Sequence, residues 1–162
     1  MGPLVSENQA NKVMGYIESG KSQGARLVLG GNRIDRPGFY VEPTVFADCT
    51  QDMKIWREEI FGPVVSIMKF KSGENCVEDA LAIANDSKYG LTAGFFTNDR
   101  VKAQTMARRL QAGQVGNNCF MGIGQDVPFG GYKESGTGRE FSRASLDNFM
   151  ETKTVIVDCS TP

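Results

Sequence analysis

Histidine is missing from all 162 residues of this chain. Its absence excludes nucleophilic pairs in which an imidazole activates a serine or a cysteine, and it excludes imidazole metal sites. The 4 cysteines lie far apart and form no C-x-x-C pair. This spacing disfavours a zinc site and favours reduced thiols, as expected for a cytoplasmic protein.

Long apolar runs and strong net charge are missing as well. No run approaches the ~20 residues that a membrane helix needs, and the N-terminal segment has no apolar core of a signal peptide. The 18 basic and 19 acidic residues leave a net charge of -1. We therefore expect neither nucleic acid nor a membrane as the partner, and the composition is that of an ordinary globular protein.

One short stretch matches a nucleotide-binding motif. Residues 15–22, GYIESGKS, fit the phosphate-loop pattern G-x-x-x-x-G-K-[ST]. A phosphate loop must follow a buried strand and open a helix, because its free amides surround the phosphate at the helix N-terminus. Here Ser6 and Gln9 form a capping-box pattern that predicts a helix through this stretch, ending at Gly24 and followed by a strand. The order is reversed, so a nucleotide hydrolase remains only as an alternative.

Helical and strand patterns alternate along the rest of the chain. Apolar runs at residues 64–70 and 91–97 predict two buried strands, and residues 74–86 and 99–113 have helical spacing. A short helix at 139–150 and a final strand at 152–158 (TKTVIVD) follow. This alternation predicts an α/β fold with mostly parallel strands.

Two further features point to ligand binding. Residues 122–138 contain six glycines, which is typical of a functional loop, although no G-x-G-x-x-G dinucleotide motif occurs. Glu58 and Glu59 precede an apolar turn. Adjacent carboxylates usually face solvent, but a carboxylate at the mouth of a strand also suits the paired hydroxyls of a ribose.

Five stretches resemble the C-terminal third of the NAD(P)-dependent aldehyde dehydrogenase superfamily. They are MGPLVS, REEIFGPVVSI, AND with YGL after it, LQAGQV with Asn118, and PFGGYKESGTGRE. The resemblance covers nearly the whole chain. MGPLVS, the DC after PTVFA and the AND pattern are most similar to the betaine-aldehyde and trimethylaminobutyraldehyde branch.

The resemblance assigns roles to individual residues. It implies that Glu59 holds the ribose on the nicotinamide side of NAD, or of NADP, and that Phe61 packs near the nicotinamide ring. It places Phe120 and Phe129 in the lining of the substrate tunnel, where aromatic faces suit a quaternary ammonium group. It makes Glu140 a candidate for a catalytic charge relay.

The resemblance also implies an ion site and a division of the chain. The backbone carbonyls of Lys133 and Gly136 match a potassium site of the betaine branch. Residues 1–150 match part of the catalytic domain, and residues 151–162 match the oligomerisation strand and tail. That strand would pair with a neighbouring subunit and give a homo-oligomer.

The chain also departs from the family. Gly116 and Asn117 stand where bulky apolar residues are usual, and Ser142 replaces a common glycine. The nucleophilic cysteine, the general-base glutamate and the dinucleotide-binding domain precede the part of the family that this chain matches. We therefore expect residues 1–162 alone to be inactive, although the complete enzyme would oxidise an aldehyde to a carboxylate with NAD. The alternative is a non-catalytic module that pairs through its final strand.

Overall fold

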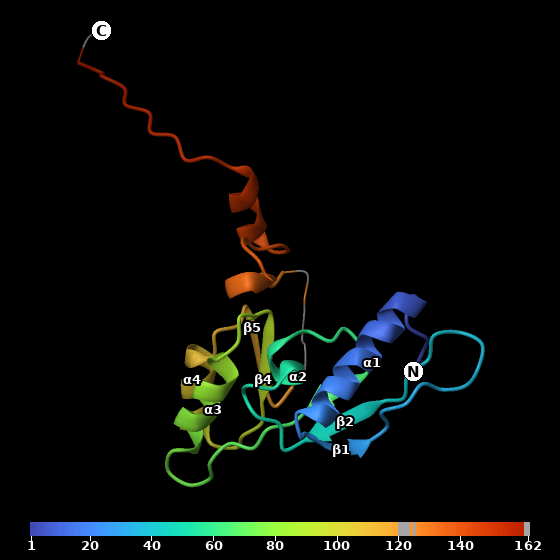
Figure 1. Cartoon of the computed structure of the whole chain (residues 1–162). Coiled ribbons are helices and arrows are strands. Elements are labelled where there is room, and N and C mark those ends of the chain that lie inside the picture. The colour runs from blue at the N-terminus through green and yellow to red at the C-terminus, as the bar shows by residue number, and fades with distance from the viewer. Residues whose placement is uncertain (120–123, 125, 161–162) are drawn as a thin grey trace. The chain divides into compact units, whose positions relative to one another are not determined.

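A computed structural model describes residues 1–119, 124 and 126–160 of the chain. The chain divides into two compact units, Met1–Cys76 and Val77–Pro162, and each is described by itself (Figure 1). No helix in the described residues is long and apolar enough to cross a membrane.

The first unit begins with helix α1, Glu7–Ser22. Ser6 caps it by accepting a hydrogen bond from the Gln9 amide at 3.2 Å, and Gly24 takes a φ of 90° just after its end. Both boundaries agree with the sequence prediction. Residues 15–22 lie wholly inside α1 and precede a strand, so their amides bond to carbonyls of the helix and cannot surround a phosphate.

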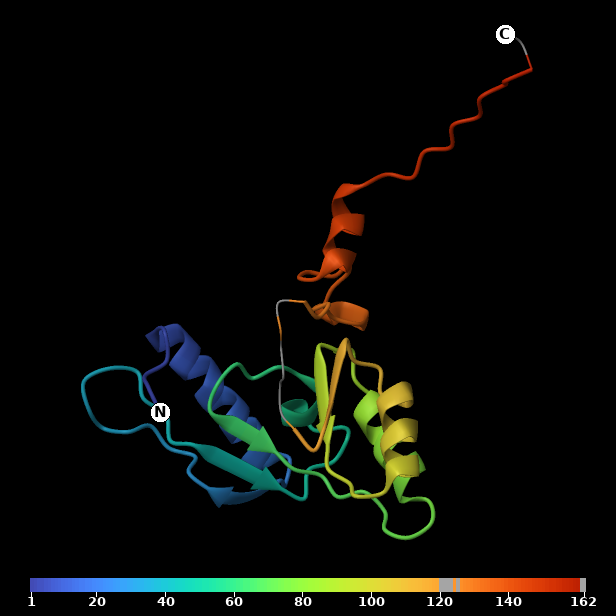
Figure 2. The ribbon, with the colours of Figure 1, turned by 180° about the vertical axis from the view of Figure 1, so that it is seen from behind.

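A three-stranded sheet follows, with β1 Arg26–Leu29, β2 Thr44–Ala47 and β3 Val64–Ser66 in that order. β1 pairs antiparallel with β2, and β2 pairs parallel with β3. Figures 1 and 2 show α1 on one face of this sheet. The core between them has Val13, Ile17 and Phe46 at its centre, each fully buried.

The strand predicted over residues 64–70 is shorter and more exposed than expected. Only Val64–Ser66 pair as β3, and the side chains of Val65 and Ile67 are 55% and 45% exposed. Apolar letters alone predict burial on both faces. In the described chain β3 is instead the edge strand of its sheet, paired on one side only.

The second unit contains two helices and two parallel strands, α3 Cys76–Asn85, β4 Thr92–Phe95, α4 Arg100–Arg109 and β5 Gln114–Asn117. The helices agree with the prediction, whereas β5 was not predicted. β4 is not buried on both faces as predicted, because its residues alternate between exposed and half-buried positions. Among the described residues of this unit, Leu81 and Leu110 are the buried apolar side chains.

The C-terminal part contains two 3-10 helices, Lys133–Ser135 and Arg143–Phe149. The second lies where a short helix is predicted. The strand predicted at residues 152–158 does not form, since residues 151–159 have no regular secondary structure. A strand requires a hydrogen-bonding neighbour, and this segment has none in the described chain. Ile156 is 90% exposed.

Candidate functional site

The turn at residues 58–62 places one buried side chain between exposed ones. It follows the short helix α2, Lys54–Arg57, and Glu58 is extended, with φ -113° and ψ 149°. Neighbouring side chains of an extended chain point in opposite directions. Ile60 is accordingly buried, 8% exposed, whereas Glu59 is exposed and Phe61 is 75% exposed.

Helix α1 holds this turn through three side chains of one face. Gln9 donates from Nε2 to the carbonyl oxygens of Phe61 at 2.9 Å and Ile60 at 3.4 Å. A Cβ atom at Gly62 would lie 2.6 Å from Cγ2 of Val13, so the turn approaches the helix closely. Positions 9, 13 and 16 are helical neighbours, and Tyr16 supplies the third contact.

The two adjacent glutamates have different surroundings. The Tyr16 hydroxyl donates to Oε2 of Glu58 at 2.8 Å, and Nζ of Lys54 lies 4.0 Å from the same oxygen. Glu59 makes no hydrogen bond or ion pair with any described residue. The structure therefore separates one occupied carboxylate from one free carboxylate, a distinction that the sequence does not contain.

Phe61 has an unusual backbone as well as an exposed ring. Its φ is 55°, which is uncommon for a residue with a side chain and costs about 1 kcal/mol or more. The contacts from Gln9 and Val13 on either side hold it there. The carboxylate of Glu59 can accept hydrogen bonds from two vicinal hydroxyls of a ligand. The ring of Phe61 can cover a flat ring attached to the same ligand.

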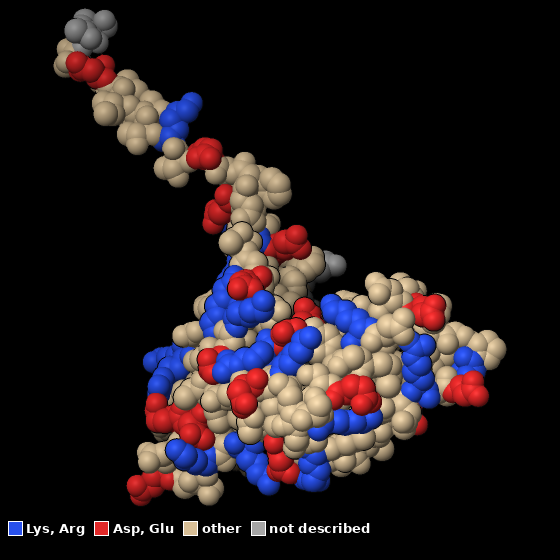
Figure 3. Space-filling model, viewed as in Figure 1, with Lys and Arg blue, Asp and Glu red and all other residues tan. Residues whose placement is uncertain are grey.

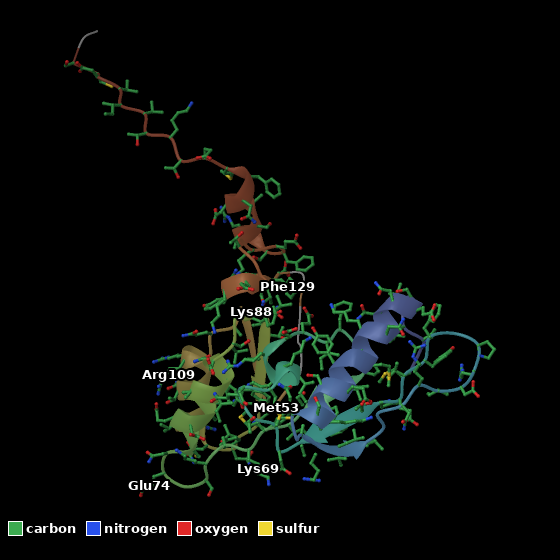
Figure 4. The ribbon with its side chains drawn as sticks, in the orientation of Figure 1. Met53, Lys69, Glu74, Lys88, Arg109 and Phe129 are labelled. Carbon is green, nitrogen blue, oxygen red and sulfur yellow. The ribbon has the colours of Figure 1, made fainter. Side chains whose placement is uncertain are left out.

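Two other predicted site residues meet in the second unit. Phe129 and Glu140 form an isolated antiparallel bridge, with N–O distances of 2.9 and 2.7 Å. The Phe129 ring lies 6.2 Å from the Phe141 ring between centroids, and Phe129 is labelled in Figure 4. The Glu140 side chain is exposed. Phe120 lies outside the described residues.

The loop that carries the predicted potassium ligands is anchored to the end of α3. Nζ of Lys133 donates to the carbonyl oxygens of Asn85 at 2.7 Å and Ser87 at 2.8 Å. The Gly136 φ is 140°, a conformation that favours glycine. No group of three or more cysteine, aspartate or glutamate side chains in the described residues could hold a metal ion.

Close backbone contacts fix the same loop, and sequence reasoning missed them. A Cβ atom at Gly113 would lie 1.6 Å from the Gly130 carbonyl oxygen. The Gly90 amide donates to Oγ of Ser135 at 2.9 Å, and its carbonyl accepts from the Tyr132 amide at 2.8 Å. The only signal in the sequence is the presence of the glycines, and their partners lie far away along the chain.

Two departures from the family pattern have local explanations. A Cβ atom at Gly116 would lie 2.5 Å from the Cys119 carbonyl oxygen, so a side chain does not fit there. Ser142 has a φ of 56°, which explains why glycine is common at this position. Its hydroxyl compensates in part by accepting a hydrogen bond from the Ala144 amide at 3.2 Å.

Ion pairs join the elements within each unit, and basic and acidic side chains are interspersed on the face shown in Figure 3. Asp48 lies 2.8 Å from Nε of Arg26 and 3.2 Å from Nζ of Lys69. Hydrogen bonds from these two cations lower the pKa of Asp48. In the second unit a hydrogen bond from Arg109 lowers the pKa of Glu78 in the same way.

Comparisons of this chain with known proteins identify relatives in one protein family. A model described as the aldehyde dehydrogenase family matches residues 1–155. The chain is 49% identical over 156 residues to "Aldehyde dehydrogenase, mitochondrial" of Equus caballus, covering 96% of this chain and 30% of that protein. It is 48% identical over 159 residues to "Aldehyde dehydrogenase, cytosolic 1" of Mus musculus, covering 98% and 31%.

Solved structures agree in fold. The NAD+ complex of an aldehyde dehydrogenase from Bacillus cereus superposes with a TM-score of 0.91 at 46% identity, over 99% of this chain and 32% of that one. An NAD-dependent aldehyde dehydrogenase from Sinorhizobium meliloti gives a TM-score of 0.93 at 41% identity, over 100% and 32%. The chain thus spans less than a third of the length of these proteins. By sequence and by fold, it belongs to the aldehyde dehydrogenase family.

Proposed function

We propose that this chain forms the nicotinamide-ribose side of the NAD site in an aldehyde dehydrogenase. The observation that carries the proposal is the free carboxylate of Glu59 beside the exposed ring of Phe61, on a turn that α1 holds. Two solved relatives are complexes with NAD+, the Bacillus cereus enzyme and an indole-3-acetaldehyde dehydrogenase. NADP is the alternative cofactor.

In this proposal Glu59 and Phe61 orient the cofactor and do not react themselves. Bound NAD supplies the hydride acceptor for the oxidation of an aldehyde to a carboxylate. Glu59 would accept hydrogen bonds from both ribose hydroxyls, and Phe61 would pack against one face of the attached ring. These contacts would restrict the position of the nicotinamide ring relative to the aldehyde. Holding two reactants in the right geometry is a main source of rate acceleration by enzymes.

We propose an aldehyde with a quaternary ammonium group, such as betaine aldehyde, as the substrate of the complete enzyme. The paired rings of Phe129 and Phe141 support this, because aromatic faces attract such cations. Phe120 would belong to the same lining, and Glu140 to a charge relay. The carbonyl oxygens of Lys133 and Gly136 would hold a potassium ion.

We further propose that residues 151–162 pair with a second subunit to give a homo-oligomer. The exposed, unpaired run Val155–Val157 supports this assignment, with its three side chains 71%, 90% and 72% exposed. A non-catalytic module that pairs through the same run is the second candidate. A cytoplasmic location remains a prediction.

Ligand binding and turnover test the proposal separately. Nicotinamide riboside should bind the purified chain with a Kd of about 1–10 mM, the range expected for a small ligand with one bidentate contact. Saturation-transfer NMR measures this, and Glu59→Gln should abolish the advantage of the riboside over 1-methylnicotinamide, a cation of equal charge without the ribose. Equal binding of the two ligands by the unaltered chain would overturn the proposal.

The absence of turnover is a separate expectation. With betaine aldehyde and NAD, the 162-residue chain should produce no NADH absorbance above the blank, because its family places the nucleophilic cysteine and the general base in a region outside this match. Turnover above the blank would show that the chain contains a complete catalytic site.

A further inference from the structure

Tyr16 connects the core of the first unit to the turn of the candidate ribose site. Its ring belongs to the buried cluster under α1, and the residue is only 7% exposed. Its hydroxyl reaches Oε2 of Glu58 at 2.8 Å. Packing of the ring in this cluster restricts the position of the hydroxyl, and therefore the direction of this hydrogen bond.

We propose that Tyr16 is a positioning residue for ribose binding, and this inference rests on the function proposed above. By holding the Glu58 carboxylate against α1, Tyr16 sets the direction of the extended segment that follows. Because adjacent side chains of an extended segment point oppositely, holding the half-exposed Glu58 side chain toward Tyr16 directs Glu59 to the opposite side. Tyr16 thereby determines the direction of the Glu59 carboxylate without contacting it.

The other contacts of the turn do not replace this hydrogen bond. Gln9 and Val13 fix the far end of the turn, at residues 60–62. Lys54 lies 4.0 Å from Glu58, but both side chains are about half exposed, and exposed ion pairs of this kind contribute little. The Glu58 amide also donates to the Lys54 carbonyl oxygen at 3.0 Å, which fixes the backbone of residue 58. Without the Tyr16 hydroxyl, the Glu58 carboxylate itself would have only the weak ion pair with Lys54.

The Glu58 carboxylate would then be free to turn toward the same side as Glu59. Two adjacent carboxylates on one side repel each other and compete for the same hydroxyls. The loss should therefore affect the ribose contact more than the contact with the flat ring, which depends on Phe61 at the far end. This difference separates positioning from a general loss of stability.

The test compares two ligands on three forms of the purified chain by saturation-transfer NMR. Nicotinamide riboside contains the vicinal hydroxyls, whereas 1-methylnicotinamide has the same ring charge without the ribose. Tyr16→Phe removes only the hydroxyl and keeps the packed ring. Tyr40→Phe is the matched control, because the Tyr40 hydroxyl makes no hydrogen bond with any described residue and its ring stacks on Arg36.

We expect Tyr16→Phe to raise the Kd of the riboside about fivefold, the effect of one lost hydrogen bond, and to leave the Kd of 1-methylnicotinamide within about twofold. Tyr40→Phe should leave both unchanged. An equal weakening of both ligands by Tyr16→Phe, or no weakening of either, would overturn the inference while Glu59→Gln still tests the proposed function. If the unaltered chain does not prefer the riboside, the proposed function fails and the inference fails with it.

Discussion

The close approach of Gly62 to Val13 gives the sharpest prediction about stability. A Cβ atom at position 62 would lie 2.6 Å from Cγ2 and 3.0 Å from Cγ1 of Val13, a side chain that is 0% exposed. Real carbon atoms do not approach so closely, so Gly62→Ala must displace either the turn or the helix. Overpacking of this kind costs about 1–3 kcal/mol.

A double-mutant cycle shows whether this contact is the cause. Val13→Ala removes both methyl groups that the new Cβ would meet, and by itself leaves a cavity that costs about 1–3 kcal/mol. The new methyl group partly fills that cavity, so the double variant should be more stable than the sum of the single effects by about 1–2 kcal/mol.

The measurement is urea or thermal unfolding of the 162-residue chain, followed by the fluorescence of Trp56, its only tryptophan. Trp56 packs partly buried against the core of this unit, so it reports on the same structure. A loss of 1 kcal/mol should lower the melting temperature by about 4–8 °C for a unit of this size. Gly15→Ala is the matched control, since nothing lies within 4 Å of a Cβ built there, and this change inside a helix should stabilise by about 0.5–1 kcal/mol.

Two results would refute the reasoning. If Gly62→Ala does not destabilise, the turn does not approach α1 as closely as the structure indicates. If the single effects simply add in the double variant, the cost comes from the backbone of residue 62 and not from Val13.

Three further predictions concern other parts of the chain. Two cations lower the pKa of Asp48, so its contribution to the stability of the fold is complete above the ordinary aspartate pKa and is lost as pH falls through the lowered value. The stability of Asp48→Asn should therefore depend less on pH in that range when acid unfolding is measured. An unchanged pH profile would contradict the ion pair. Gly113→Ala would place a Cβ 1.6 Å from the Gly130 carbonyl oxygen, so limited proteolysis should cut residues 126–140 faster than in the unaltered chain, and equal rates would count against the contact. Val155→Pro with Val157→Pro removes two backbone donors, and light scattering should show a shift from oligomer to monomer, whereas a monomeric unaltered chain would contradict strand pairing.

Local signals in the sequence predicted α1, α3 and α4, but not the short helix α2. The boundaries of α1 depend on the Ser6 side chain and on Gly24, which act within a few residues of their positions. Such interactions are encoded by neighbouring letters and can be read without a structure. The same signals placed residues 15–22 inside a helix, which is why the phosphate-loop match could be discounted.

Burial could not be predicted in the same way. The run at residues 64–70 is apolar, but whether its faces are covered depends on which elements lie beside it, and Val65 is 55% exposed in the described chain. β5 was missed because its sequence QVGN has few strand-forming residues. It forms because the end of α4 brings it beside β4, where four residue pairs match in parallel register.

The features of the candidate site also separate into those that the sequence predicts and those that require the structure. The sequence by itself determined the helix α1, the family pattern, and the presence of two adjacent carboxylates before an aromatic residue. Only the tertiary structure decided which carboxylate is free, because that choice depends on Tyr16, 42 positions away from Glu58. Local structure follows from contacts between near neighbours, whereas the direction of a binding side chain follows from packing between segments that only the fold brings together.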